Sequence, residues 1–415
     1  MPKLPRRILR LAGLFSSAAI LTLASACTPP VEKLWEYPTG SPLYSTPLLL
    51  NDLIVFGSEG GSLNAVDRKG QSRWTYSVSS GEVYAHPVSD GKFIFFGATN
   101  QMFYALDLSG RAKWQYTTRE RIKSDPAVSE GVAYATSYDG HIYALKAETG
   151  ELIWQFPPVA TQTPAAPTED KKEEEAPAGD KPADAAGDKP ADAAGDKPAD
   201  AAGDKPAEPA PPPEVIAPKA FSYAAPVIRD GVLYVGNLDG TMYAVHTADG
   251  SLKWRFKTGG GITSTSLIHE DTLFFGSKDD HVYAIDLATG SKLKWKFKTG
   301  DDVLSSPTLA DGVLYIGSND KKLYAIDAAN GQEKCHFEAR GEIISIPKVY
   351  KDLVFFGSGQ GDGYIYAIER DSCKLFWKFK TGYKIESDPV FDGDQFYITS
   401  GDNKLYAFKV NKTSK

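Results

Sequence analysis

The sequence predicts an all-β protein, an eight-bladed β-propeller of four-stranded blades, from three observations. A unit of about forty residues recurs along most of the chain. Each unit holds four short segments of alternating aromatic and β-branched residues, separated by turn sequences. The last unit lacks its fourth segment, and an isolated segment of that type precedes the first unit. Repeats of this length and strand content are typical of propeller blades.

One residue just before the innermost strand marks the register of the repeat. It is a proline in seven units and a serine in one. Neighbouring positions lie 39 to 42 residues apart, except for a gap of 100 between the third and fourth, which holds one repeat plus an insert. The eight positions are Pro47, Pro87, Pro126, Pro226, Ser266, Pro307, Pro347 and Pro389.

The third unit illustrates the four predicted strands, which are residues 127–128, 132–136, 141–145 and 152–156. Glu-Gly, Asp-Gly and Thr-Gly pairs separate them, and such pairs favour the tight turns of antiparallel hairpins. A linear solenoid is the alternative architecture for a repeat protein. Four antiparallel strands per unit fit a solenoid poorly, so a closed ring is expected.

The two ends of the globular region predict how the ring closes. The last unit ends after its third strand, residues 404–410, with no tryptophan-containing strand behind it. Residues 33–37, with Trp35, form such a strand without a unit of their own. We therefore expect the N-terminal strand to complete blade eight, which removes the open edges that a sheet protein must hide.

The N-terminus has the pattern of an export signal that ends in a lipid attachment site. Four basic residues within the first ten precede an apolar run, Leu11–Ala26, which is too short to span a bilayer comfortably. Residues 23–27, Leu-Ala-Ser-Ala-Cys, resemble the lipobox of bacterial lipoproteins. This resemblance implies removal of the signal peptide, residues 1–26, and acylation of Cys27 with palmitate. An ordinary secretory signal with an incidental cysteine is the alternative.

The expected mature protein is anchored in the bacterial outer membrane by its lipid alone and faces the periplasm. Residues 27–32 would form a short tether. Thr28 after the cysteine favours outer-membrane sorting over the inner membrane, and no later segment is apolar enough to span a bilayer. The propeller then comprises residues 33–160 and 219–410, followed by a tail, residues 411–415.

Residues 161–218 differ in composition from the rest of the chain. They repeat Ala-Gly-Asp-Lys-Pro-Ala-Asp-Ala and hold fourteen acidic residues and six lysines. The net charge of this segment is therefore −8, whereas that of the whole chain is −7. Such a composition predicts a disordered insert. A solvated spacer projecting away from the membrane and a partner-capturing segment are the two possible roles. The remaining body is close to neutral and is expected to have no basic stripe, which argues against nucleic acid as a partner.

The residue pattern predicts no catalytic site, no metal site and no bound cofactor. The six histidines are scattered, and His141 and His281, at the same repeat position, are expected to be exposed neighbours of a turn. No cysteine or histidine spacing suits a transition metal. The aspartate-rich turns, such as Asp279-Asp280 and Asp362, lack the alternating ligands of a calcium loop. Turn formation explains them.

All seven tryptophans occupy one place, the outermost strand of a repeat, which indicates packing between blades. The segments from Ala144 through Gly150 to Trp154, and from Ala244 through Gly250 to Trp254, resemble the tryptophan-docking repeat of quinoprotein dehydrogenase propellers. This resemblance implies that each indole packs on the glycine peptide of the next motif. The predicted docking residues are Trp35, Trp74, Trp114, Trp154, Trp254, Trp295 and Trp377.

The same resemblance implies a disulfide between Cys335 and Cys373. Cys335 stands at the tryptophan place of the sixth unit, and Cys373 stands at the glycine place of the seventh. If docking brings these places together, the two thiols face each other, and an exported location permits their oxidation. Two buried free thiols are the alternative.

Two families share this repeat and imply different functions. The quinoprotein dehydrogenases hold pyrroloquinoline quinone (PQQ) on the axis with an adjacent-cysteine disulfide, a tryptophan and calcium ligands. This sequence has no adjacent cysteines, and its tryptophans are all assigned to docking. Residues 23–160 and 219–410 more closely resemble the BamB-type lipoprotein of the outer-membrane β-barrel assembly machinery.

The resemblance to the BamB type implies a non-enzymatic scaffold, monomeric within a complex, that binds proteins of the assembly machinery. Its partner contacts lie in loops without a motif, so no binding residue can be transferred to this sequence. Another envelope-binding propeller is the main alternative, and a PQQ-dependent dehydrogenase is the third hypothesis.

Overall fold

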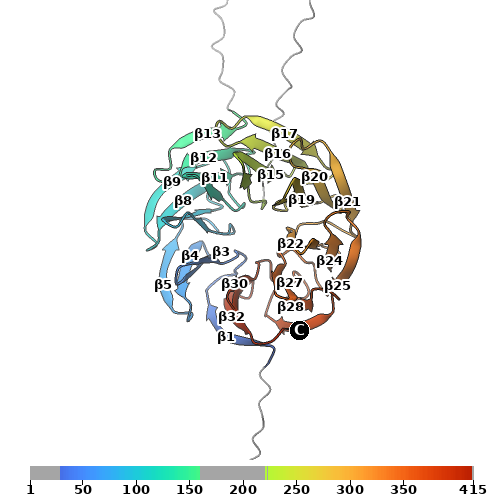
Figure 1. Ribbon diagram of the computed structural model, residues 1–415. Helices are drawn as coiled ribbons and strands as arrows, with labels where there is room; N and C mark the ends of the chain where they lie inside the picture. The colour runs from blue at the N-terminus through green and yellow to red at the C-terminus, as the bar shows by residue number, and fades with distance from the viewer. Residues whose placement is uncertain (1–28, 159–219, 222, 414–415) are drawn as a thin grey trace, which may run out of the picture.

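The computed structural model describes residues 29–158, 220–221 and 223–413, which form a ring of eight four-stranded antiparallel sheets (Figure 1). This confirms the predicted eight-bladed all-β propeller. The leader with Cys27 and the predicted insert, residues 161–218, lie outside the described residues. No helix among the described residues is long and apolar enough to cross a membrane.

Each of the first four blades takes its strands from consecutive segments, named from the axis outward. Blade 1 comprises β2 (Leu48–Leu50), β3 (Leu53–Ser58), β4 (Ser62–Asp67) and β5 (Ser72–Ser77). Blade 2 comprises β6 (Val88–Ser89), β7 (Phe93–Gly97), β8 (Met102–Asp107) and β9 (Ala112–Thr117). Blade 3 comprises β10 (Ala127–Ser129), β11 (Val132–Thr136), β12 (Ile142–Lys146) and β13 (Leu152–Phe156). Blade 4 comprises β14 (Val227–Arg229), β15 (Val232–Gly236), β16 (Thr241–His246) and β17 (Leu252–Lys257).

The second half of the ring repeats this order, except that blade 8 takes its outermost strand from the N-terminus. Blade 5 comprises β18 (Leu267–His269), β19 (Thr272–Ser277), β20 (His281–Asp286) and β21 (Leu293–Lys298). Blade 6 comprises β22 (Thr308–Ala310), β23 (Val313–Gly317), β24 (Lys322–Asp327) and β25 (Glu333–Glu338). Blade 7 comprises β26 (Lys348–Tyr350), β27 (Leu353–Gly357), β28 (Tyr364–Glu369) and β29 (Leu375–Lys380). Blade 8 comprises β30 (Val390–Asp392), β31 (Gln395–Ser400), β32 (Lys404–Val410) and β1 (Val31–Pro38).

The ring closes through β1, as the sequence predicts. β1 pairs with β32 in an antiparallel register that runs from Val31 opposite Val410 to Pro38 opposite Lys404. The closure extends beyond the strands, because the backbone N–H of Asn411 donates to the carbonyl of Pro30 at 2.9 Å. The first and last ordered strands thus lie side by side (Figure 1).

The hydrophobic core lies between neighbouring blades and is built from the two middle strands of each blade. β7 and β15 are buried at every residue, because their two faces pack against different neighbours. The outermost strands instead alternate between exposed and half-buried residues, since only one of their faces meets the next blade. Most of the apolar clusters, such as that joining Phe95 in blade 2 to Ala133 in blade 3, span a blade boundary.

Strand order gives the ring two distinct faces. Each connection from an outermost strand to the next innermost strand lies on one face, here called the loop face. β1 begins and β32 ends on the opposite face, here called the terminal face. The described chain stops at Pro158 and resumes at Ala220 within such a connection, so both residues belong to the loop face.

Six tryptophans join neighbouring blades through one repeated contact. The indole of each lies over a glycine in the turn before the outermost strand of the next blade, so closely that a Cβ on that glycine would meet the ring at 2.2–2.9 Å. Each indole Nε1 also donates to a backbone carbonyl of that turn, at 2.8–3.2 Å. The pairs are Trp35–Gly70, Trp74–Gly110, Trp114–Gly150, Trp154–Gly250, Trp254–Gly290 and Trp295–Gly331.

The boundary between blades 6 and 7 carries a disulfide in place of this contact. The Sγ atoms of Cys335 and Cys373 lie 2.06 Å apart, and the Cα atoms are separated by 6.0 Å. Cys335 lies opposite Ala325 in β25, at the register position that tryptophan occupies elsewhere. Cys373 has a φ of 54°, close to the conformation of the turn glycines. This is the pairing that the motif positions imply.

Trp377 differs from the other six because blade 8 has no turn to receive it. The strand beside β32 is β1 from the N-terminal end of the described chain, so the turn that carries the docking glycine in other blades does not connect these two strands. Trp377 packs instead on Phe408, with ring centroids 5.5 Å apart and nearly perpendicular planes. It therefore docks against blade 8, but through an aromatic contact.

Candidate functional site

One cavity lies on the axis at the loop face, where segments from all eight blades converge. Its volume is about 260 Å³. One part of its wall is aliphatic, with Leu304, Ile344 and Ile346 from blades 6 and 7. The opposite part is aromatic and cationic, with Tyr84 and Lys123 among its residues. Because every blade contributes, no single repeat reveals this site in the sequence.

A belt of hydrogen bonds around the axis supports the cavity. At five of the eight register positions, the preceding residue donates its backbone N–H to the side chain of the equivalent residue in the next blade. Five such bonds occur, with distances of 2.6–2.9 Å. They run from His86 to Asp125, Ala225 to Thr265, Thr265 to Ser306, Ile346 to Asp388 and Asp388 to Thr46. The carboxylates of Asp125 and Asp388 therefore hold blades together.

His86 and Asp125 form an ion pair in the cavity wall. The imidazole Nδ1 lies 2.8 Å from Asp125 Oδ2, while the other carboxylate oxygen accepts the His86 N–H. Burial alone would lower the pKa of His86. The charge and hydrogen bond of Asp125 outweigh that effect and raise the pKa of His86 above its usual value. The paired carboxylate leaves this histidine poorly placed to act as a free base.

A tyrosine arc lies on the loop face, and three of its five members line the cavity. We use this name for Tyr44, Tyr84, Tyr138, Tyr223 and Tyr383. The rings of Tyr44 and Tyr84 are nearly parallel, with centroids 6.1 Å apart. Lys384 lies 4.6 Å above the first ring, and Lys123 lies 4.1 Å above the second.

Two exposed members of the tyrosine arc make it suited to protein contact. Tyr223 is 50% exposed and Tyr383 is 51% exposed, the largest values among the exposed apolar and aromatic side chains described. Arg121 lies 4.4 Å over the Tyr138 ring. Tyrosine and arginine are enriched at the centres of protein interfaces, where rigid rings bury much area at little entropic cost. Sequence reasoning missed this arc, because its members occupy loops that carry no motif.

The aspartate-rich turns link neighbouring blades. In the turn between the second and third strands of blade 5, Asp279 Oδ2 accepts the Tyr283 hydroxyl at 2.6 Å and the Gly259 N–H of blade 4 at 2.8 Å. Asp320 and Asp402 make the same two contacts with their neighbours. The sequence interpretation of these residues as turn formers was therefore incomplete, since they also join blades 5, 6 and 8 to the preceding blade.

His141 and His281 lie beside these turns, but they are largely buried. Their side chains are 14% and 18% exposed, so the expectation of exposed histidines was wrong. The Nδ1 atom of His281 lies 2.7 Å from the Asp279 carbonyl, which fixes the ring against the turn. His141 makes the equivalent contact with the Asp139 carbonyl, so both histidines have a structural role beside the turn.

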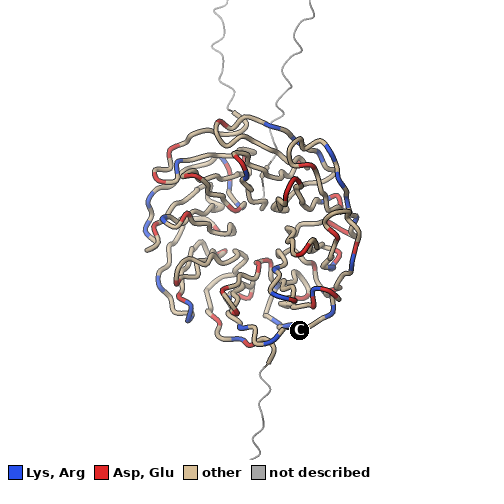
Figure 2. Tube along the Cα trace, viewed as in Figure 1, with Lys and Arg blue, Asp and Glu red and all other residues tan. Residues whose placement is uncertain are grey.

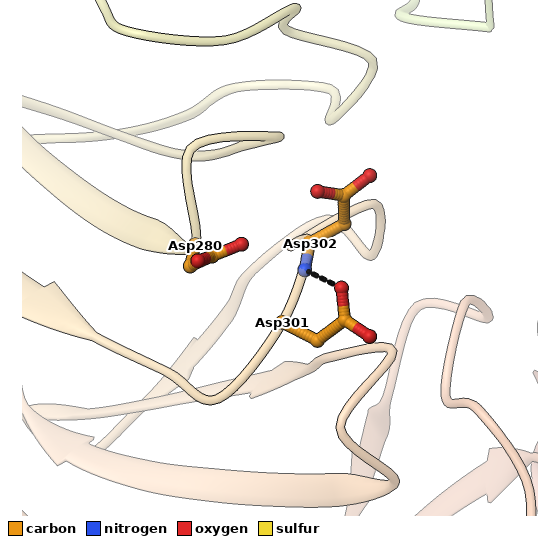
Figure 3. A group of neighbouring side chains, drawn as sticks. All are labelled: Asp280, Asp301 and Asp302. Atoms are coloured by element: carbon orange, nitrogen blue, oxygen red, sulfur yellow. Dashed lines mark hydrogen bonds between the residues drawn. The ribbon is translucent and has the colours of Figure 1, made fainter.

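Among the described residues, one group of acidic side chains could bring three oxygen ligands together, namely Asp280, Asp301 and Asp302. Figure 3 shows that the Asp302 carboxylate points away from Asp301, whose own carboxylate accepts the Asp302 N–H at 2.7 Å. Asp280 pairs with Lys298 at 3.2 Å. Burial and the neighbouring carboxylates raise the pKa of Asp302. Nothing beyond the acidic residues themselves indicates a metal, and we assign none.

The outer rim carries a basic stripe, so the expectation of a body without one was wrong. Lys and Arg gather on the outermost strands β17 and β21, at the upper right of the ring (Figure 2). The total charge of the body is near neutral and does not show where its charges lie. Alternate residues of two strands come to share one exposed side only when the strands form.

A ring of four-stranded blades locked by tryptophan–glycine contacts defines a propeller of the PQQ-repeat class. The family model described as outer membrane protein assembly factor BamB matches residues 59–181 and 214–334, which is more than half of the chain. The chain therefore belongs to this family. Comparison with curated protein sequences finds no match.

Solved structures similar to this chain share its fold at low sequence identity. BamB from Moraxella catarrhalis is 15% identical with a TM-score of 0.66, over 91% of this chain and 99% of that one. The computationally designed Ika8 protein is 14% identical with a TM-score of 0.69, over 91% and 100% of the two chains. Quinohemoprotein alcohol dehydrogenase ADHIIG from Pseudomonas putida HK5 is 15% identical with a TM-score of 0.67, over 93% and 77%.

The cavity residues do not fit the quinone site that the dehydrogenase resemblance implies. All tryptophans of the described chain lie in outermost strands, away from the cavity. The bonded cysteines join β25 to the turn before β29 at the rim and are 38 residues apart. Asp125 and Asp388 are already engaged in the belt. We derive no quinone chemistry from this arrangement.

Proposed function

We propose that this chain is a non-enzymatic, protein-binding scaffold lipoprotein that assists β-barrel protein assembly at the bacterial outer membrane. The family match over residues 59–181 and 214–334 is the observation that carries this proposal. The lipobox-like segment ending at Cys27 supports attachment to the outer membrane on its periplasmic side. Its partners are then proteins of the assembly machinery.

The tyrosine arc is the surface that we assign to the partner. Tyr223 and Tyr383 are exposed in this arc, where Lys123 and Arg121 lie against the rings of Tyr84 and Tyr138. Because these cations are already ordered, binding an acidic or carbonyl-rich loop there costs little additional side-chain entropy. The adjacent cavity, of about 260 Å³, has room for one large side chain of that partner.

Photo-crosslinking in intact envelopes tests this assignment. A benzophenone amino acid replaces Tyr223 in one variant and Tyr383 in another, and Lys351, exposed on the terminal face, carries the probe in the control. We expect the loop-face probes to capture components of the β-barrel assembly machinery, identified by mass spectrometry, and the control to capture none. Recovery of no such component at either tyrosine overturns the proposal.

The structural likeness to quinohemoprotein alcohol dehydrogenase favours one competing function that can be tested directly. Purified protein is mixed with PQQ and calcium, and dye reduction with primary alcohols is followed. A scaffold gives no activity above the protein-free control. Saturable, alcohol-dependent dye reduction would overturn the non-enzymatic assignment.

A further inference from the structure

The basic stripe on the rim arises from one repeated set of positions. The residues one before, one after and three after the tryptophan place share a side of the outermost strand, because side chains alternate. In blades 4 and 5 all six of these positions are basic. They are Lys253, Arg255, Lys257, Lys294, Lys296 and Lys298, here called the basic rim. In blades 8, 1, 2 and 3 only Arg73 and Lys113 are basic.

Protection of sheet edges does not account for the basic rim. A lysine on an edge strand discourages pairing with another chain, and a single charge in a strand serves that purpose. Blade 3 has none, since Ile153 and Gln155 occupy its first two positions. Six like charges on two neighbouring strands repel one another, and this repulsion destabilises the fold unless an opposite charge lies against them.

The described residues only partly neutralise the basic rim. Lys294 pairs with Asp271 at 2.6 Å, and Lys298 pairs with Asp280 at 3.2 Å. Lys257 donates to the carbonyl of Asp239. No ion pair is found for Lys253, Arg255 or Lys296 within the described part of the chain. The stripe therefore presents several free cations at the surface.

The same chain supplies a matching negative charge beside this surface. Residues 161–218 hold fourteen acidic residues against six lysines. They connect β13 of blade 3 to β14 of blade 4, and β17 of the basic rim belongs to blade 4. Strand direction places Lys257 and Lys298 at the loop-face ends of their strands, the face to which Pro158 and Ala220 belong.

Chain length permits the contact from both attachment points. Glu169, the first acidic residue of the segment, is eleven residues beyond Pro158, a reach of up to about 36 Å. Glu214, its last, is six residues before Ala220. Because the segment is tethered at both ends, its effective concentration at the basic rim is in the millimolar range, so ion pairs that are individually weak can form there.

We infer that the acidic segment of residues 161–218 docks on the basic rim of blades 4 and 5. The contact is electrostatic and weakens as salt is added, since exposed charges are screened within about 8 Å at physiological ionic strength. This inference is independent of the proposed function, because it concerns two parts of one chain and needs no assembly partner.

Carbodiimide crosslinking of the purified soluble Cys27→Ser protein tests the inference, since this reagent joins only carboxylates and amines that are in contact. Mass spectrometry then maps which lysines bond to the segment. We expect crosslinks to the basic-rim lysines to exceed those to Lys113 and Lys378 several-fold, and to fall by a similar factor in 0.5 M NaCl. They should persist on dilution, because the contact lies within one molecule.

A charge-reversal variant adds a readout at the rim lysines that it leaves in place. In R255E/K296E, crosslinks to the remaining rim lysines should drop several-fold, whereas the matched R73E/K113E variant on blades 1 and 2 should leave them unchanged. Unfolding temperatures equal to that of the parent establish that both variants fold. Crosslinks spread evenly over the surface lysines, found only between molecules, or absent would overturn the inference. The second of these would identify another copy as the occupant.

Discussion

Two glycines of blade 3 allow the energetic role of tryptophan docking to be isolated. Gly150 and Gly131 have nearly equal positive φ angles, 73° and 75°. A Cβ at Gly150 would lie 2.6 Å from the Trp114 ring, whereas a Cβ at Gly131 would meet no atom within 4 Å. Alanine at either position introduces the same backbone strain, about 1–2 kcal/mol. Only alanine at Gly150 also displaces an indole.

We therefore expect Gly150→Ala to reduce the free energy of unfolding by about 2–4 kcal/mol more than Gly131→Ala. Displacing a packed ring costs about 1–3 kcal/mol, and weakening the 2.9 Å bond from Trp114 Nε1 to the Ala147 carbonyl costs about 1 kcal/mol. Equilibrium urea unfolding, followed by circular dichroism, measures both losses. Equal losses in the two variants would show that Gly150 only permits the turn, and would refute the docking argument.

Three further outcomes follow from the structure and the sequence. Replacing Cys335 and Cys373 together by serine should lower the free energy of unfolding by about 4 kcal/mol, since the disulfide closes a loop of 38 residues, and non-reducing peptide mapping that finds both thiols free in the parent would contradict the bond. Hydrogen bonds to Asp139 and Asp279 outweigh burial and hold the pKa of each below its usual value of 3.8, so they stabilise the folded protein above about pH 4. That stability should be lost as the pH falls through their lower folded pKa values. In Asp279→Asn, the free energy of unfolding measured from pH 6 to pH 2 should therefore fall less steeply than in the parent. Cys27→Ser should abolish labelling with radioactive palmitate and release the protein from membranes, and labelling that persists would show that Cys27 is not the lipid acceptor.

The repeat allowed the architecture to be predicted because local patterns and the global fold agree at each blade. Eight register positions, four strand segments per unit and an unpaired strand at the N-terminus leave one natural way to close the ring. The strand starting at residue 141 in the prediction begins at Ile142 in the structure, since the His141 N–H is held in the turn by Asp139. Such shifts reflect turn hydrogen bonds that strand periodicity does not encode.

The sequence determined the tryptophan places and the two cysteine positions, because a repeat aligns equivalent residues of neighbouring blades without any knowledge of coordinates. It did not show what replaces glycine as the partner of Trp377, since the contact with Phe408 depends on how the side chains of blades 7 and 8 pack. The tyrosine arc and the belt through Asp125 and Asp388 were also decided only by the tertiary structure. Their members are separated by many repeats and meet at the axis only when the ring has closed. The basic rim was also decided by the tertiary structure. Its charges are spread along a near-neutral sequence, and they form one surface only when side chains alternate along the strands and blades 4 and 5 lie side by side.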